Sequence, residues 1–173
     1  GLLTIETGND AVRINGAVTL ESDLRIDTAF AAATDMEVGN VTFTNDSPVD
    51  SQSTEANDLR INAGMAAALF NEDIGGAAAD SELGRLVIEQ ADAGVIFGVT
   101  DTELGAGTTG PVNQIELRGD GTAANALDIG SLATIGGNGI VFNGGPVGGL
   151  LTIETGNDAV RINGAVTLES DLR

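Results

Sequence analysis

GLLTIETGNDAVRINGAVTLESDLR occupies residues 1–25 of the chain and recurs without a single change at residues 149–173. The two copies define a period of 148 residues, of which the chain holds one complete unit and the first 25 residues of another. Surface positions of separate domains drift freely, so this identity indicates duplicated units of an array. We therefore predict one full repeat at residues 1–148 and the start of the next identical repeat at residues 149–173, both within a longer tandem array.

Short triplets with the pattern apolar–any–apolar form two series that alternate along the chain. The first series lies at residues 3–5, 24–26, 59–61, 86–88, 115–117 and 151–153. The second series lies at residues 12–14, 41–43, 68–70, 95–97, 140–142 and 160–162. This pattern is typical of β-strands with one buried face, and the Gly, Asn, Asp and Ser residues between the triplets are typical of turns. The Ala-rich runs at 29–34 and 77–79 are too short for stable helices, so we expect an all-β fold.

The alternation of the two series predicts a parallel β-solenoid in which each coil stacks on the next. The spacing of the triplets predicts five or six coils per period, with loop length absorbing the variation. Stacked residues lie about 4.8 Å apart in such a fold, so like side chains should form columns, and turn amides should hydrogen-bond along the axis. The expected columns are Leu3, Leu24, Leu59 and Leu86; Phe43, Phe70 and Phe97; and Asn15, Asn71, Asn143 and Asn163. A tandem β-sandwich of antiparallel hairpins is the alternative architecture.

Three acidic segments between the triplets, at 46–58, 72–84 and 100–114, are expected to protrude from the trunk as loops. They are the predicted places for lateral contacts or ligand binding. Neither end of the chain has the polar outer face of a capping repeat. The Gly1 end repeats an internal segment, and Arg173 follows Leu172 inside a strand-like run. We therefore expect both ends to stack on neighbouring identical repeats.

Three runs carry a family resemblance: VTFTNDSPVD at residues 41–50, NDLRINAG at 57–64, and GIVFNGGPV at 139–147 with LTI at 151–153. They resemble the repeats of filamentous-haemagglutinin-like bacterial exoproteins, which are giant surface adhesins. The resemblance covers nearly the whole period and rests on pattern and composition. It implies a right-handed parallel β-helix, export across bacterial membranes and display at the cell surface. The chain differs from these repeats in its strict periodicity and its acidity.

Composition narrows the classes of partner. The formal net charge is −19, and all seven basic residues are Arg. This argues against nucleic-acid binding, because neutralising phosphates requires clusters of Lys and Arg; a solvated, self-repelling surface is the simpler interpretation. No apolar run has the length of a membrane span, so no span is predicted in this segment. The chain contains no Cys, which is compatible with an extracellular location.

Catalytic chemistry finds little support in the sequence. Without His or Cys, the usual triads and thiol nucleophiles are absent. The sequence matches G-x-G-x-x-G at 105–110 and a looser form of it at 119–124, but neither match is followed by the helix that a dinucleotide site needs. Arg-Gly-Asp at 118–120 is predicted to be the end of a strand and the turn that follows it. The carboxylate pairs Glu72 with Asp73 and Asp101 with Glu103 are expected in solvated loops. We predict no enzyme and assign no catalytic, cofactor-binding or metal-binding residue.

Calcium is a possible cofactor, because the turns at 8–10, 21–23 and 57–58 supply several oxygen ligands. However, the sequence has no D-x-[DN]-x-[DN]-G loop and no G-G-x-G-x-D nonapeptide; the run at 136–139 begins like that nonapeptide but lacks its Asp. A calcium-binding repeat is therefore the least favoured interpretation.

The function expected from these features is structural. The chain is predicted to be a repeat of a very large secreted or cell-surface bacterial protein, forming a rigid stalk, fibre or sheath. Its expected partners are neighbouring identical repeats and, through lateral self-association, other copies in a fibre or layer. The alternative is an adhesin module that contacts a host, a partner cell or a polysaccharide through its loops.

Overall fold

The computed structural model describes residues 1–29, 39–76, 78–98, 112–119, 124–144, 150–169 and 171–173. Throughout these residues the regular secondary structure is β-strand, and every pairing between named strands is parallel. The predicted all-β fold with parallel strands is therefore confirmed, and it is compatible with a β-helix or solenoid. Antiparallel hairpins, which the sandwich alternative requires, do not occur among these strands.

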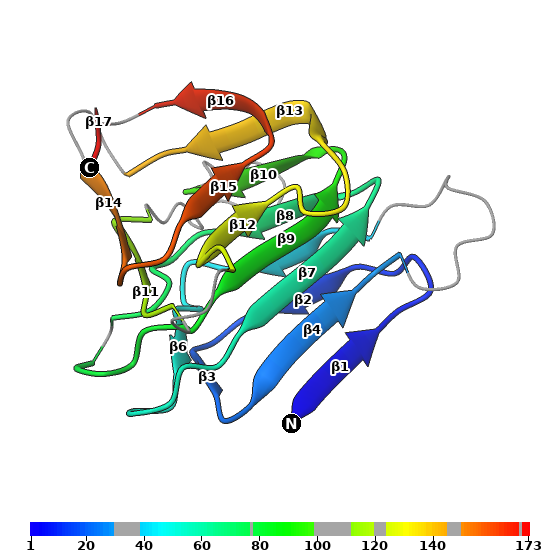
Figure 1. Ribbon diagram of the computed structural model, residues 1–173. Coiled ribbons are helices and arrows are strands. Elements are labelled where there is room, and N and C mark those ends of the chain that lie inside the picture. The colour runs from blue at the N-terminus through cyan, green and yellow to red at the C-terminus, as the bar shows by residue number, and fades with distance from the viewer. Residues whose placement is uncertain (30–38, 77, 99–111, 120–123, 145–149, 170) are drawn as a thin grey trace.

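The first sheet contains six strands that are far apart in sequence (Figure 1). In spatial order they are β1 (Leu2–Glu6), β4 (Asp23–Asp27), β7 (Leu59–Gly64), β9 (Leu86–Ala91), β12 (Leu127–Ile129) and β15 (Val160–Ile162). Their register places Leu3, Leu24, Leu59 and Leu86 in one column, as predicted, and continues it through Leu127. An isoleucine column from Ile5 to Ile162 runs parallel to it.

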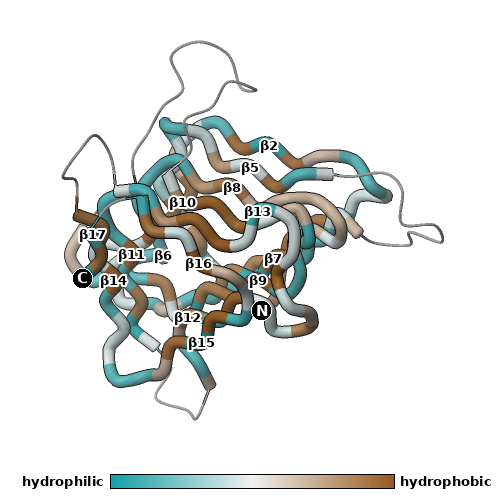
Figure 2. The backbone as a smooth tube through the Cα atoms, turned by 90° about the horizontal axis from the view of Figure 1, so that it is seen from above, coloured by the Kyte–Doolittle hydropathy of each residue, from teal (hydrophilic) through white to brown (hydrophobic). Residues whose placement is uncertain are grey.

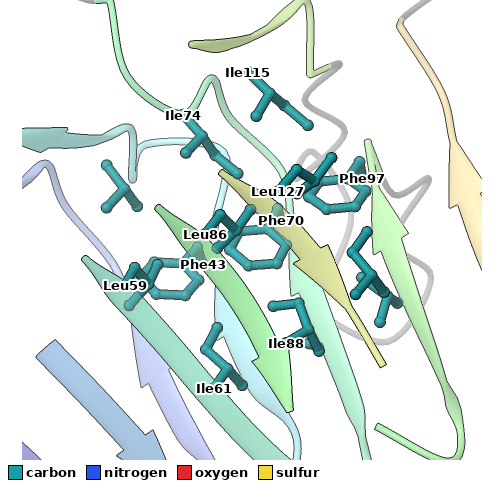
Figure 3. Close-up of a cluster of buried hydrophobic side chains, with 14 of the residues drawn as sticks. Phe43, Leu59, Ile61, Phe70, Ile74, Leu86, Ile88, Phe97, Ile115 and Leu127 are labelled. Atoms are coloured by element: carbon teal, nitrogen blue, oxygen red, sulfur yellow. The ribbon is translucent and has the colours of Figure 1, made fainter. Parts of the chain in front are cut away.

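The second sheet also contains six strands and carries the aromatic ladder. In chain order they are β2 (Val12–Ile14), β5 (Val41–Phe43), β8 (Ala67–Phe70), β10 (Gly94–Phe97), β13 (Ile135–Phe142) and β16 (Gly164–Leu168). Phe43, Phe70 and Phe97 stack with nearly parallel rings and centroids 5.1 and 5.0 Å apart, as predicted, and Phe142 extends the ladder by a further 5.1 Å. Figure 3 shows the ladder beside the leucine column of the first sheet.

A third sheet completes the arrangement, and the sequence did not predict it. Its strands are β3 (Val18–Leu20), β6 (Val49–Ser51), β11 (Gln114–Leu117), β14 (Leu150–Thr155) and β17 (Asp171–Leu172). β3 pairs with β6, and β11 pairs with β14, which pairs with β17. Ile74 joins the two groups, because it forms parallel bridges to Val49 on one side and Ile115 on the other.

The third sheet corrects the expectation that residues 46–58 and 72–84 protrude. Val49, Ile74 and Leu83 are fully or almost fully buried, so these segments belong to the trunk. Exposed stretches remain at residues 52–55 and 78–80. The prediction was wrong because Val49 and Ile74 are single apolar residues among acidic and polar ones. Such isolated residues do not form a recognisable strand pattern, although their side chains face the core. Most of the segment 100–114 lies outside the described residues.

The chain visits the first, second and third sheets in this order and then begins again. We call one such passage a coil. Figure 2, seen from above, shows the three sheets around a common interior, with hydrophobic positions prominent along their strands. The fully buried side chains fill the space that the three sheets enclose, and they include most of the column residues and Phe43, Phe70, Phe97 and Phe142.

Three of the twelve predicted triplets occupy a different sheet from the one expected. Residues 115–117 and 151–153 lie in the third sheet rather than the first, and residues 160–162 lie in the first sheet rather than the second. The physical reason is that all three sheets present the same requirement, an apolar residue at alternate positions facing inward. The triplet pattern therefore identifies strands without identifying their sheet.

The predicted asparagine column is also only partly correct. Asn15, Asn71 and Asn143 follow strands of the second sheet, whereas Asn163 follows β15 in the first. Thr44 separates Asn15 from Asn71, and its hydroxyl donates a hydrogen bond of 2.8 Å to the Asn15 side-chain oxygen. Gly98 occupies the next position, where its φ of +80° and the close approach of the Asn143 carbonyl leave no room for a side chain.

Replacing one of the two inner rings of the ladder tests the packing. Phe70 is fully buried between two stacked rings, so Phe70→Ala should lower the free energy of unfolding by about 3–5 kcal/mol. Leu132→Ala is the control, because Leu132 is 70% exposed and its loss should change stability by less than about 0.5 kcal/mol. Urea unfolding followed by circular dichroism measures both; equal effects would contradict the ladder.

Candidate functional site

The two ends of the stacked strands are the most distinctive surfaces of the molecule. β1, β2 and β3 form one end, and β15, β16 and β17 form the other. Leu3 is 59% exposed at the first end, and Leu168 is 53% exposed at the second. Their neighbours in the same inner columns, such as Leu24 and Phe142, are buried. Each end therefore exposes apolar side chains that the interior coils cover.

The backbone at these ends is also partly uncovered, because the end strands have a pairing partner on one side only within the described residues. Within the described residues, β1 pairs with β4 on one side only, and β16 pairs with β13 on one side only. An edge strand presents a row of N–H and C=O groups that can pair with another strand. The exposed apolar residues Leu2, Val160, Val166 and Leu172 belong to the same terminal strands. At both ends, exposed apolar side chains therefore coincide with unpaired strand edges, and both ends are built from the repeated 25-residue sequence.

The outer surface between the ends carries alternating charges. Arg25 forms ion pairs with Asp27 at 2.7 Å and with Glu89 at 2.8 Å, and the hydrogen bond to Glu89 raises its pKa further. Asp58 lies near Arg60 and Arg85, yet burial raises its pKa against the opposing effect of both guanidinium groups. Such pairs offset part of the like-charge repulsion that a net charge of −19 creates.

A shallow hollow of about 210 Å³ lies on the third sheet and is lined mainly by Glu82, Glu116, Arg118 and Glu154. Glu116 and Glu154 are register neighbours on β11 and β14. Burial raises the pKa of Glu116, and the charges of Glu154 and Glu82 raise it further. Arg118 donates to Glu82 at 3.1 Å and to Asp80 at 3.3 Å, so a single guanidinium group forms ion pairs with both carboxylates. The carboxylates that line the hollow therefore stand beside one another on a largely solvated face.

Polar groups of the turns considered for calcium already form hydrogen bonds, both between coils and within a turn. Asp23 accepts a hydrogen bond of 2.9 Å from the Asp58 backbone, and the Asn57 side chain donates to the Leu20 carbonyl at 2.8 Å. In the 8–10 turn, the Asp10 carbonyl accepts from the Thr7 hydroxyl. Among the described residues, no group of three or more His, Cys, Asp or Glu side chains is placed to hold a metal ion. Calcium binding stays a prediction.

One of the carboxylates considered for catalysis, Asp73, forms hydrogen bonds that hold the backbone of a neighbouring coil. Asp73 accepts hydrogen bonds from the backbone N–H groups of Asn113 at 2.6 Å and Gln114 at 3.2 Å, which joins two coils. Burial raises the pKa of the adjacent Glu72. Asp101, Glu103 and the 105–110 glycine motif lie outside the described residues. Arg118 directly follows β11, as expected for a strand end, while Asp120 also lies outside the described residues.

Sequence reasoning anticipated uncapped ends but missed the third-sheet surface. The alternating pattern recurs a few residues after two of the second-series triplets. It recurs at Val18 and Leu20 after residues 12–14, and at Val49 and the small residue Ser51 after residues 41–43. That recurrence was the available signal, although the polar residues around it made it weak.

Comparison with known protein families, curated proteins and solved structures found no match to this chain. The resemblance to filamentous-haemagglutinin-like repeats therefore stays a prediction. In the part of the chain that the structure describes, no helix has the length and apolar character needed to cross a membrane.

The raised pKa of Glu116 predicts a pH-dependent stability. The folded state favours the protonated carboxyl, so Glu116 should destabilise the fold at neutral pH and cease to do so as pH falls through its folded pKa toward the ordinary value of 4.5. Glu116→Gln should therefore raise the urea midpoint at pH 7, with the gain fading near pH 4. Glu21→Gln, at an exposed site, controls for net charge. An equal gain from both variants would contradict the local cause.

Proposed function

We propose that this chain is a structural segment of a tandem array, in which successive periods stack coil on coil into a continuous right-handed parallel β-solenoid. The array would serve as the rigid stalk, fibre or sheath of a very large secreted or cell-surface bacterial protein. The observation that carries the proposal is that both ends expose apolar columns and edge strands, and that both are built from the same 25 residues.

Energetics support the stacking of ends. Full burial of a leucine side chain contributes roughly 1.5–3 kcal/mol, so covering side chains that are half exposed would contribute about 1 kcal/mol each. Unpaired strand edges would gain backbone hydrogen bonds at the same time. A solenoid distributes its stability over neighbouring units in this way. The right-handed sense follows the general preference of parallel crossovers.

The charge distribution supports a slender rod over tight lateral packing. A net charge of −19 on one segment creates repulsion between neighbouring rods, and salt screens it. Assembly into a fibre or sheath would therefore depend on ionic strength. Secretion and surface display belong to the same proposal and are supported by the family resemblance.

Adhesion through loops is supported less well. Two of the three segments expected to protrude supply buried residues of the third sheet, such as Val49 and Ile74. The exposed excursions that remain at 52–55 and 78–80 are short. A spacer role needs no ligand surface, so the structural function is the better proposal.

Lengthening the array tests the proposal directly. A chain extended to three periods should melt cooperatively and at a higher temperature than the 173-residue chain, because fewer coils per unit remain uncovered. Thermal melting by circular dichroism measures the difference. If the short chain were monomeric and melted as high as the long one, each period would be a closed domain and the continuous solenoid would be wrong.

A charge placed at one end tests the interaction surface. We expect the 173-residue chain to associate end to end, and Leu168→Glu to weaken this association by about tenfold, which corresponds to 1.4 kcal/mol. Leu132→Glu introduces the same charge at an exposed loop position away from the ends and should leave association unchanged. Sedimentation over a range of concentrations measures both. An equal loss in both variants would assign the effect to net charge instead.

A further inference from the structure

The two identical copies of the 25-residue sequence occupy different sheets. β1 lies in the first sheet, whereas its copy β14 lies in the third. β2 lies in the second sheet, whereas its copy lies within the first as β15, and β3 lies in the third sheet, whereas its copy lies in the second within β16. Each element of the second copy is thus displaced by one sheet, in the same direction.

The displaced copy keeps its internal pairing. In the first copy, Leu2 pairs with Asp23 and Leu3 with Leu24. In the second copy, Leu150 pairs with Asp171 and Leu151 with Leu172, which are the same residues one period later. The sequence therefore forms the same strand contact in the first sheet and in the third. This is physically reasonable because both inner faces accept aliphatic side chains at alternate positions.

A buried carboxylate favours the displaced position. Asp128 on β12 is buried, and Arg161 on β15 donates to it at 2.7 Å. Arg13, the first-copy equivalent of Arg161, instead stands beside Thr42 in the second sheet. If the second copy kept the sheets of the first, β14 would stack on β12 and place Thr152 beside Asp128. A threonine cannot neutralise a buried carboxylate, and leaving one unpaired is costly.

The number of strand positions in one period accounts for the displacement. Within the described residues, the thirteen strands β1 to β13 and the Ile74 bridge position give fourteen passages through the sheets before β14 begins the second copy. At three passages per coil, these fourteen passages make four complete coils and two further passages, which is fewer than the five or six coils that the triplet spacing predicts. We infer that each period of the proposed array is rotated by one sheet relative to the period before it, and that three periods and fourteen coils restore the starting phase.

This inference rests on the proposed continuous stacking, and it identifies the partner of the exposed end. The next period should place the equivalent of β5 on β15, of β6 on β16 and of β7 on β17. Each period should advance about 22 Å along the axis, at about 4.8 Å per coil. Every outward excursion of the period would then recur in turn on all three sides of the rod, so the array has three equivalent sides rather than one specialised face.

Engineered disulfides in the 173-residue chain test the rotation. The chain has no Cys, and register neighbours about 4.8 Å apart fall within the Cα separation of a disulfide. We expect Asp128→Cys with Arg161→Cys to cross-link about tenfold more than Val141→Cys with Arg161→Cys. The second pair would form only if the second copy occupied the second sheet. Arg13→Cys with Thr42→Cys is the reference pair, since it joins the equivalent arginine to its neighbour in the first copy.

The outcomes separate the rotation from the proposed function. Preferential cross-linking of residues 141 and 161 would overturn the rotation while leaving the stacking of coils intact. If the reference pair cross-linked but neither pair with residue 161 did, the last coil would not stack, and both the rotation and the continuous solenoid would fail.

A second measurement uses the same substitution in both copies and needs no cysteine. Arg161→Gln should lower the urea midpoint, because it leaves the buried Asp128 without its cation. Arg13→Gln should not, since no ion pair of Arg13 exists within the described residues. Equal midpoints for the two variants would overturn the displaced position of the second copy.

Discussion

In-register stacking of like side chains between parallel strands is the interaction on which the rest of this structure depends. Because successive coils lie one strand spacing apart, a phenylalanine can satisfy its packing only with another large side chain directly above and below it. The ladder from Phe43 to Phe142 meets this requirement with nearly parallel rings. Leucine and isoleucine columns on the first sheet do the same. The core is therefore a set of parallel columns, and its ends are open by construction.

The same stacking creates an electrostatic problem on the outside. Parallel register places like charges beside one another, as with Glu116 and Glu154 in the third sheet. The protein relieves part of this repulsion by placing arginines between carboxylates, as with Arg25 beside Asp27 and Glu89. At Glu116, burial and the neighbouring carboxylates raise the carboxyl pKa. The strand register that stacks like side chains in the core therefore also determines which charged side chains lie beside one another on the surface.

The exposed apolar ends and the periodic columns are together the reason that the function proposed for this chain is structural. A catalytic or binding site needs a unique combination of residues in one place, whereas the columns repeat one combination at every coil. The displacement of the second copy by one sheet extends this point. A sequence that packs in more than one sheet can be repeated without an integral number of coils. In the proposed array, duplication of such a sequence would build a long, evenly sided rod.

The sequence by itself determined that the chain forms short parallel strands, and which residues share the leucine and phenylalanine columns, because stacking requires like residues at corresponding positions. It also showed that the strands at both ends are built from the same 25 residues. Only the tertiary structure decided that there are three sheets, that Val49, Ile74 and Leu83 complete the trunk, and that residues 115–117, 151–153 and 160–162 change sheets. The alternating pattern is the same for every inward-facing strand, and loops of unequal length erase the spacing that would distinguish one sheet from another. The sheet that a strand joins depends on which side chains lie next to it in the folded structure, as the ion pair of Arg161 with Asp128 illustrates, and those neighbours are defined only in three dimensions.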